Sequence, residues 1–229
     1  MAVLEAVARI VQLGGDPVRA ARVAAMRARF EERTGAFAPD DDWFEERSRA
    51  FWSDAVTRMR FGREIEGELT AGERRWLAPL ERSHRGLFRA SEGVLVDVWS
   101  GAELVVTVVD EASRAELDAA AGQLFDARVV GFSGGAPMDG STDADVGWVV
   151  ALLPGAVFHP RDATAAIEPV LAAARARDLA TDDVLDALLR MERMLRSLSR
   201  VKAAYAYRPD ALTAHGSAVP VRRAARTPT

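Results

Sequence analysis

The spacing of apolar residues changes twice along this chain, and this change limits the fold more than any other feature of the sequence. Residues 2–13 carry apolar side chains at helical spacing, whereas from about residue 86 the period shortens toward 2 and β-branched residues accumulate. Helical spacing returns after about residue 160. Because helices flank a run of strands instead of alternating with single strands, the pattern predicts an α+β fold.

Four helices are predicted before the first strand. They cover 2–13, 17–34 and 43–61, followed by a short helix that the capping-box sequence Thr70–Glu73 opens. Asp16 precedes a proline and can cap the second helix, because proline loses no hydrogen bond at the first helical position.

The middle of the chain reads as about five antiparallel strands. They are expected over 86–90, 94–99, 102–110, 124–132 and 146–153, with one short helix over 113–121. A sheet this small forms a small barrel or a curled layer with a hydrophobic face, which C-terminal helices packed on it would cover.

The predicted organisation therefore has four parts. An N-terminal helical region (1–83) precedes a central antiparallel β module (84–158), C-terminal helices (159–206) and a basic tail (207–229). The last helix is expected to run from 181 to about 206. The tail is rich in Ala, Pro, Thr and Arg, so we expect it to be disordered.

Missing residue types exclude several classes of protein. The chain has no cysteine, which rules out disulfides, thiolate metal sites and cysteine nucleophiles, and its only lysine is Lys202. A chain of 229 residues can build its core without a metal or another cofactor, and we predict none. No apolar run is long enough to span a bilayer and Glu5 lies where a signal peptide would be basic, so we expect a bacterial cytoplasmic protein with no membrane insertion.

An internal echo links the second and third predicted helices. The segment Phe30–Phe37 recurs as Phe44–Phe51, with six of eight positions matching at an offset of fourteen residues. Two copies are too few for a solenoid, and we interpret them as the arms of an αα-hairpin. The third helix also gathers Trp43, Phe44, Phe51 and Trp52 on one broad arc, a candidate contact face for a protein partner or a second copy of the chain.

Charge is distributed very unevenly along the chain. Residues 190–229 carry nine basic and two acidic groups, a net charge of +7, against −11 for residues 1–189. On the last predicted helix Arg193, Arg196 and Arg200 lie opposite an apolar arc, and the tail adds Arg222, Arg223 and Arg226. These six arginines are the candidate contacts to an anionic partner. The protein's own acidic body, a nucleic acid, an acidic protein and an anionic membrane surface all stay open as that partner.

Two motifs with catalytic or metal-binding associations fail in their context. Residues 131–135 match the G-x-S-x-G pattern, but a loop follows the serine where a nucleophile elbow needs a helix. Residues 139–145 begin like a calcium loop, but Ala144 and Val150 stand where glycine and a bidentate carboxylate are required. We therefore assign no catalytic, cofactor-binding or metal-ligating residue.

The strand sequences VLVDVWSGAELVV and QLFDARVVG, followed by an apolar strand that leads through proline into a helix, resemble the β module that accompanies the SEC-C motif in bacterial proteins. The resemblance covers roughly residues 86–175 and implies a fold. The cysteine-bearing SEC-C motif itself is absent, so the resemblance implies no metal site.

These observations favour a non-enzymatic interaction or regulatory protein that acts through helical contact faces. The alternative is a nucleic-acid-associated protein that uses the basic C-terminal helix and tail. A third hypothesis is an enzyme with a site near the loop His159–Asp162, built from His84, His159, Arg161 and Asp162.

Overall fold

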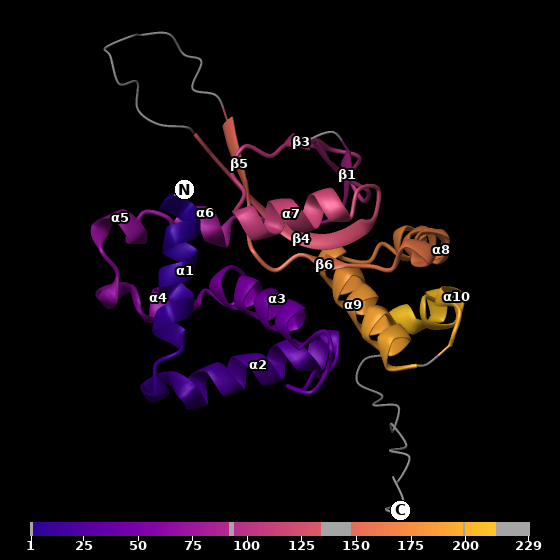
Figure 1. The fold of residues 1–229 in the computed structure, drawn as a ribbon, viewed down its shortest axis with the longest axis horizontal. Helices are drawn as coiled ribbons and strands as arrows, with labels where there is room; N and C mark the ends of the chain where they lie inside the picture. The colour runs from indigo at the N-terminus through magenta and orange to yellow at the C-terminus, as the bar shows by residue number, and fades with distance from the viewer. Residues whose placement is uncertain (1, 92–93, 134–147, 199, 214–229) are drawn as a thin grey trace, which may run out of the picture.

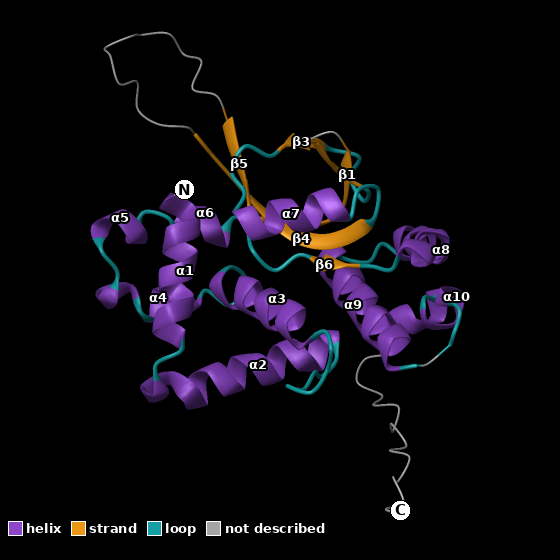
Figure 2. Cartoon of the chain, viewed as in Figure 1, coloured by secondary structure: helices purple, strands orange, loops and turns teal. Residues whose placement is uncertain are grey.

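The computed structural model describes residues 2–91, 94–133, 148–198 and 200–213. Figure 1 shows the order of its elements, with helices before and after a central sheet. Helices flank the strands on more than one side in Figure 2, and the fold class is α+β, as the apolar spacing predicts.

Helices make up the N-terminal region. They are α1 (Ala2–Gly14), α2 (Ala20–Thr34), α3 (Phe44–Val56) and the short α4 (Phe61–Glu64), α5 (Ala71–Arg74) and α6 (Leu77–Glu81). Asp16 caps the 3-10 turn that leads into α2 by accepting a hydrogen bond from the Val18 amide (2.9 Å). The Thr70–Glu73 capping box is confirmed in both directions. The single helix predicted over 43–61 is wrong at its end, because α3 ends at Val56 and Arg60, in a left-handed conformation (φ 56°), precedes the separate helix α4.

The strands of the central sheet pair antiparallel, and the bridge between Val108 and Ala151 outside them is parallel. Its strands are β1 (His84–Ser91), β2 (Val94–Asp97), β3 (Glu103–Val105), β4 (Leu124–Ser133), β5 (Trp148–Leu152) and β6 (Val157–Phe158). Their order is β3-β2-β1-β4-β5, and β6 pairs with β4. The helix α7 (Glu111–Ala119) connects β3 to β4 (Figure 1).

The sheet curls until its two edges meet. After β3, Thr107 and Val108 donate backbone hydrogen bonds to the Val150 carbonyl of β5 (3.0 and 3.2 Å), and Leu152 donates back to Val108 (2.9 Å). The predicted third strand over 102–110 thus covers both a short strand and this closing segment. The result is a curled sheet with an inner and an outer face.

Alternate residues of β4 serve the two faces of the sheet. Phe125, Ala127 and Val129 join the core of the inner face, together with Phe88 of β1. The residues between them, among them Asp126, point toward the helices. This period of two is the alternation that the sequence predicts.

The C-terminal helices cover the outer face of the sheet. They are α8 (Thr164–Ala176), α9 (Thr181–Ser197) and α10 (Ala203–Ala206), followed by a 3-10 turn over Pro209–Thr213. The prediction of one helix from 181 to 206 is wrong after Ser197. Tyr207 and Leu212 are buried in the C-terminal core, so ordered structure extends into the segment predicted to be a disordered tail.

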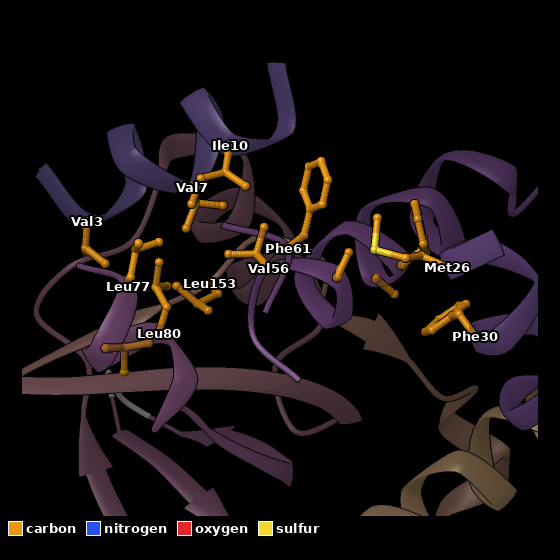
Figure 3. Packing of buried hydrophobic residues seen from close by; sticks show 14 of the residues in the cluster. Val3, Val7, Ile10, Met26, Phe30, Val56, Phe61, Leu77, Leu80 and Leu153 are labelled. Carbon is orange, nitrogen blue, oxygen red and sulfur yellow. The ribbon is translucent and has the colours of Figure 1, made fainter. Parts of the chain in front are cut away.

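A shared core joins the N-terminal helices to the sheet. In Figure 3, Val3 and Val7 of α1 point toward Leu77 of α6, while Met26 and Phe30 lie at the far end of the same cluster. The cluster also takes in apolar residues of β4, β5 and α9. The N-terminal helices are thus packed on the sheet and on α9.

Candidate functional site

The aromatic face of α3 lies inside the N-terminal core. Phe51 is fully buried and contacts Phe30 edge-to-face (ring centroids 5.9 Å apart). Trp43, Phe44 and Trp52 are partly buried against the same cluster. The structure therefore uses this face within one molecule and does not present it as an open surface.

Two of the candidate arginines on α9 contact the protein's own body. Arg193 hydrogen-bonds the Ala36 carbonyl, and Arg196 pairs with Glu46 (2.9 Å) and with Glu192. Arg200 follows the end of α9 and is exposed. Arg222, Arg223 and Arg226 lie outside the described residues. The arginines that the structure places on α9 thus attach the helix to the N-terminal region.

The repeated segment of α2 and α3 also contributes arginines that bind α9. Arg33 and Arg47 are equivalent residues of the two copies, and both reach acidic residues of α9. Arg33 pairs with Asp186 (2.8 Å), and Arg47 pairs with Glu192 (2.7 Å). The αα-hairpin therefore binds α9 through a repeated arginine.

A buried ion network extends this contact into the sheet. Arg85 of β1 pairs with Asp126 and with Asp186 (2.6 Å each). Arg128 of β4 pairs with Asp54 of α3 (2.6 Å), which also pairs with Arg33. Burial opposes the ionisation of Asp186, but the charges of Arg85 and Arg33 outweigh it and hold the pKa of Asp186 below its ordinary value.

The network encloses a cavity of about 20 Å³, which is the size of one water molecule. Asp54, Arg85, Asp126 and Arg128 line it, so three layers of the fold meet around charged groups that pair with one another. A space this small holds no substrate. We interpret the network as the attachment between α9, the sheet and the N-terminal helices.

The residues of the enzyme hypothesis do not come together. His84 Nε2 lies 3.1 Å from a carboxylate oxygen of the buried Asp97, whereas His159 Nδ1 lies 2.8 Å from the Tyr207 hydroxyl. His84 pairs with Val129 of β4, while the His159 amide bonds to the Leu124 carbonyl. Five residues of strand separate these two positions of β4, about 17 Å at 3.3 Å per residue.

The described part of the chain contains no cluster of side chains that could bind a metal ion. No group of three or more His, Asp or Glu residues there is placed to hold an ion. Arg161 hydrogen-bonds the Ala119 carbonyl (3.2 Å), and Asp162 is exposed. The calcium-like segment 139–145 lies outside the described residues, as does Gly134-Gly135 of the G-x-S-x-G match.

His159 makes stability depend on pH. Burial, together with the charges of Arg47 and Arg196, lowers the pKa of His159 to about 3. The folded protein holds His159 in its neutral form, whereas the unfolded chain takes up a proton at a pKa of about 6.5. The stability that this difference contributes is fully present above pH 6.5 and is lost as pH falls toward 3. We expect the unfolding free energy to fall by about 2 kcal/mol between pH 7 and pH 5 from this group alone.

Urea unfolding at several pH values measures this effect. His159→Gln removes the titrating group, so the unfolding free energy of the variant should depend less steeply on pH. The contribution of the neighbouring Glu192 to this pH dependence is common to both proteins. Equal slopes in the two proteins would show that His159 is accessible to protons in the folded state.

A pocket of about 480 Å³ lies between α7 and the inner side of the curled sheet. Its apolar lining comes from both sides and includes Val94, Leu95, Val106, Val109, Leu117 and Ala121. Polar groups also border it, namely Arg89, Ser91, Arg114 and Asp118. Sites for small molecules in proteins commonly have such a volume and such a lining, and the mouths of β-barrels are a preferred location.

Sequence and packing explain how α7 comes to border this pocket. Asp110 caps the helix by accepting a hydrogen bond from the Ser113 amide (3.0 Å), so α7 begins directly after the segment that closes the sheet. Arg114, Leu117 and Asp118 stand at i, i+3 and i+4 and share one helix face. Leu117 packs on the inner core, which turns that face toward the pocket.

In comparisons with known proteins, no family model, curated protein or solved structure matches the chain. The resemblance of 86–175 to a SEC-C-associated module stays a prediction. None of the described helices is both long and apolar enough to cross a bilayer.

Sequence reasoning did not identify the pocket. Its lining comes from β1, β2, the closing segment and α7, which are brought together only by the curl of the sheet. One feature of the sequence could have pointed to the buried arginines, because the internal repeat places Arg47 at the position equivalent to Arg33. That signal predicts an αα-hairpin but not the acidic partners on α9.

Proposed function

We propose that this chain is a non-enzymatic regulatory binding protein, and that its recognition site is the small-molecule pocket between α7 and the curled sheet. The volume of about 480 Å³ and the apolar lining with a few polar groups at its border support this proposal. The sheet that borders the pocket is held in position, because the ion network around Asp186 and the shared core attach it to the helices.

The shape of the molecule fits a regulatory role. The pocket is lined by residues of α7 and the sheet. In Figure 1, α7 lies on one side of the sheet, whereas α8 and α9 lie on the other. A ligand bound beneath α7 would alter the packing of that helix. A partner protein could then recognise the changed surface, which is how the interaction function expected from the sequence would be controlled.

A neutral, environment-sensitive dye tests the proposal. N-phenyl-1-naphthylamine is expected to bind with a stoichiometry of one per chain and to gain fluorescence in the apolar pocket. Ala121→Trp places an indole at the pocket and should weaken dye binding by about tenfold or more, since it fills volume that the dye needs.

Ala119→Trp is the matched control. Ala119 is an exposed residue near the end of α7 that does not line the pocket, so its replacement should leave dye affinity unchanged. Equal loss of binding in the two variants, or equal retention, would contradict the assignment of the pocket.

A further inference from the structure

We infer that the ligand of this pocket is an amphipathic carboxylate, an apolar body that ends in a single anionic head group, and that Arg114 binds the head group. This inference rests on the proposed function and adds the chemical class of the ligand. It follows from the charges at the border of the pocket, from the face of α7 that carries them and from the lining beneath.

Charged residues border the pocket. Among the residues that the structure describes, Arg89 and Arg114 are the basic ones and Asp118 is the acidic one. Among the residues that the structure describes, no carboxylate is ion-paired with either arginine. The buried arginines behave differently, since Arg47 and Arg85, for example, each pair with an acidic side chain. A guanidinium without a protein carboxylate is suited to bind a carboxylate of a ligand through two parallel hydrogen bonds.

The geometry of the two elements favours Arg114 over Arg89. On β1, Phe88 belongs to the inner core and Ala90 packs against it, so alternation directs the Arg89 side chain to the opposite face. Arg114 shares its helix face with Leu117, which does contact the inner core. The guanidinium of Arg114 therefore lies on the pocket side of α7.

The lining determines the rest of the ligand. Leu95 is almost fully buried, and Val109 and Leu117 are partly buried around the same space. Such a surface favours hydrocarbon, and each methylene removed from water there should tighten binding about fourfold. A head group at Arg114 with a hydrocarbon body over Leu117 and Val109 satisfies both parts of the site.

Displacement of the neutral dye by three ligands of equal chain length tests the inference at neutral pH. Decanoate, decanol and decylamine share a body and differ in the charge of the head group. We expect decanoate to bind the unmodified chain about tenfold more tightly than decanol, and decylamine to bind most weakly.

Three variants locate the charge. Arg114→Gln should reduce decanoate affinity about tenfold and leave decanol unchanged, because only the charged hydrogen bonds are lost. Arg89→Gln removes the same charge from the neighbouring strand, where the side chain points to the opposite face, and should change decanoate affinity less than threefold. Asp118→Asn removes the acidic group one turn from Arg114 and should tighten decanoate binding.

The outcomes separate the two proposals. If the dye binds but decanoate and decanol displace it equally, the pocket stands and the carboxylate class is wrong. Equal effects of Arg89→Gln and Arg114→Gln would overturn the role of Arg114, and tighter binding of decylamine, weakened by Asp118→Asn, would show a cationic ligand. If the dye itself does not bind, the proposed function fails.

Discussion

Glu192→Ala is expected to reduce the unfolding free energy by about 3–5 kcal/mol. Glu192 is fully buried and pairs with the equally buried Arg47 (2.7 Å) and with Arg196. Removing the carboxylate leaves the Arg47 guanidinium charged inside the protein, where one of its nitrogens, Nη1, already has no partner in the described part of the chain. Arginine cannot lose its charge to relieve this cost. Urea denaturation measures the loss.

The double variant Arg47→Met with Glu192→Leu should recover most of that stability. Burial raises the pKa of Glu192 despite the charges of Arg47 and Arg196, so desolvation of this carboxylate outweighs the attraction. An apolar pair of similar size removes both costs together. Glu32→Ala, on the exposed side of α2, is the control and should change stability by less than about 0.5 kcal/mol.

A double variant as unstable as Glu192→Ala would contradict this account. It would mean that the contacts of Arg47 with the α9 backbone, through the Leu189 carbonyl, matter more than the charge pair.

Gly155→Ala is expected to cost about 3–5 kcal/mol, from backbone strain and overpacking together. Gly155 lies between β5 and β6 with φ 106°, a conformation that other residues rarely adopt. A Cβ atom there would lie 2.5 Å from the Arg49 carbonyl oxygen of α3. Because that oxygen belongs to a helix backbone, either the turn or α3 must move. Thermal or urea unfolding gives the value.

Gly101→Ala separates the two causes. Gly101 also has a positive φ (76°), but a Cβ there meets no atom within 4 Å. Its replacement should cost only the conformational part, about 1–2 kcal/mol. If the two alanine variants are equally destabilised, the close approach of Gly155 to α3 contributes nothing.

Local rules predicted the elements whose determinants lie close together in sequence. The change of apolar period places the strands, and β1 begins two residues before the expected strand start at 86. The capping box Thr70–Glu73 and the cap at Asp16 also follow local chemistry. In these cases the partner groups are within three residues, so the sequence contains the whole interaction.

Predictions failed where a distant contact changes the local conformation. A helix of uniform apolar pattern was expected from 181 to 206, but the chain leaves the helix after Ser197 and returns through α10. This reversal buries Tyr207 beside His159, 48 residues earlier in the chain. Pattern within the helix carries no information about that contact.

In the candidate site, too, local features could be predicted from the sequence and contacts between distant residues could not. The sequence indicates that α9 is basic and that α2 and α3 repeat a motif, but it does not show that Arg33 and Arg47 pair with acidic residues of α9, more than 140 positions away. The pocket likewise depends on the closure of the sheet between Thr107 and Val150.

The α+β class, the order of helices and strands, and the residues able to cap or break them follow from local propensity and spacing, so they can be predicted from the sequence. The tertiary structure decided which faces are buried, which arginines are paired and where the pocket lies. Those properties follow from the free energy of burying distant groups together, which depends on their positions in space and not on their separation along the chain.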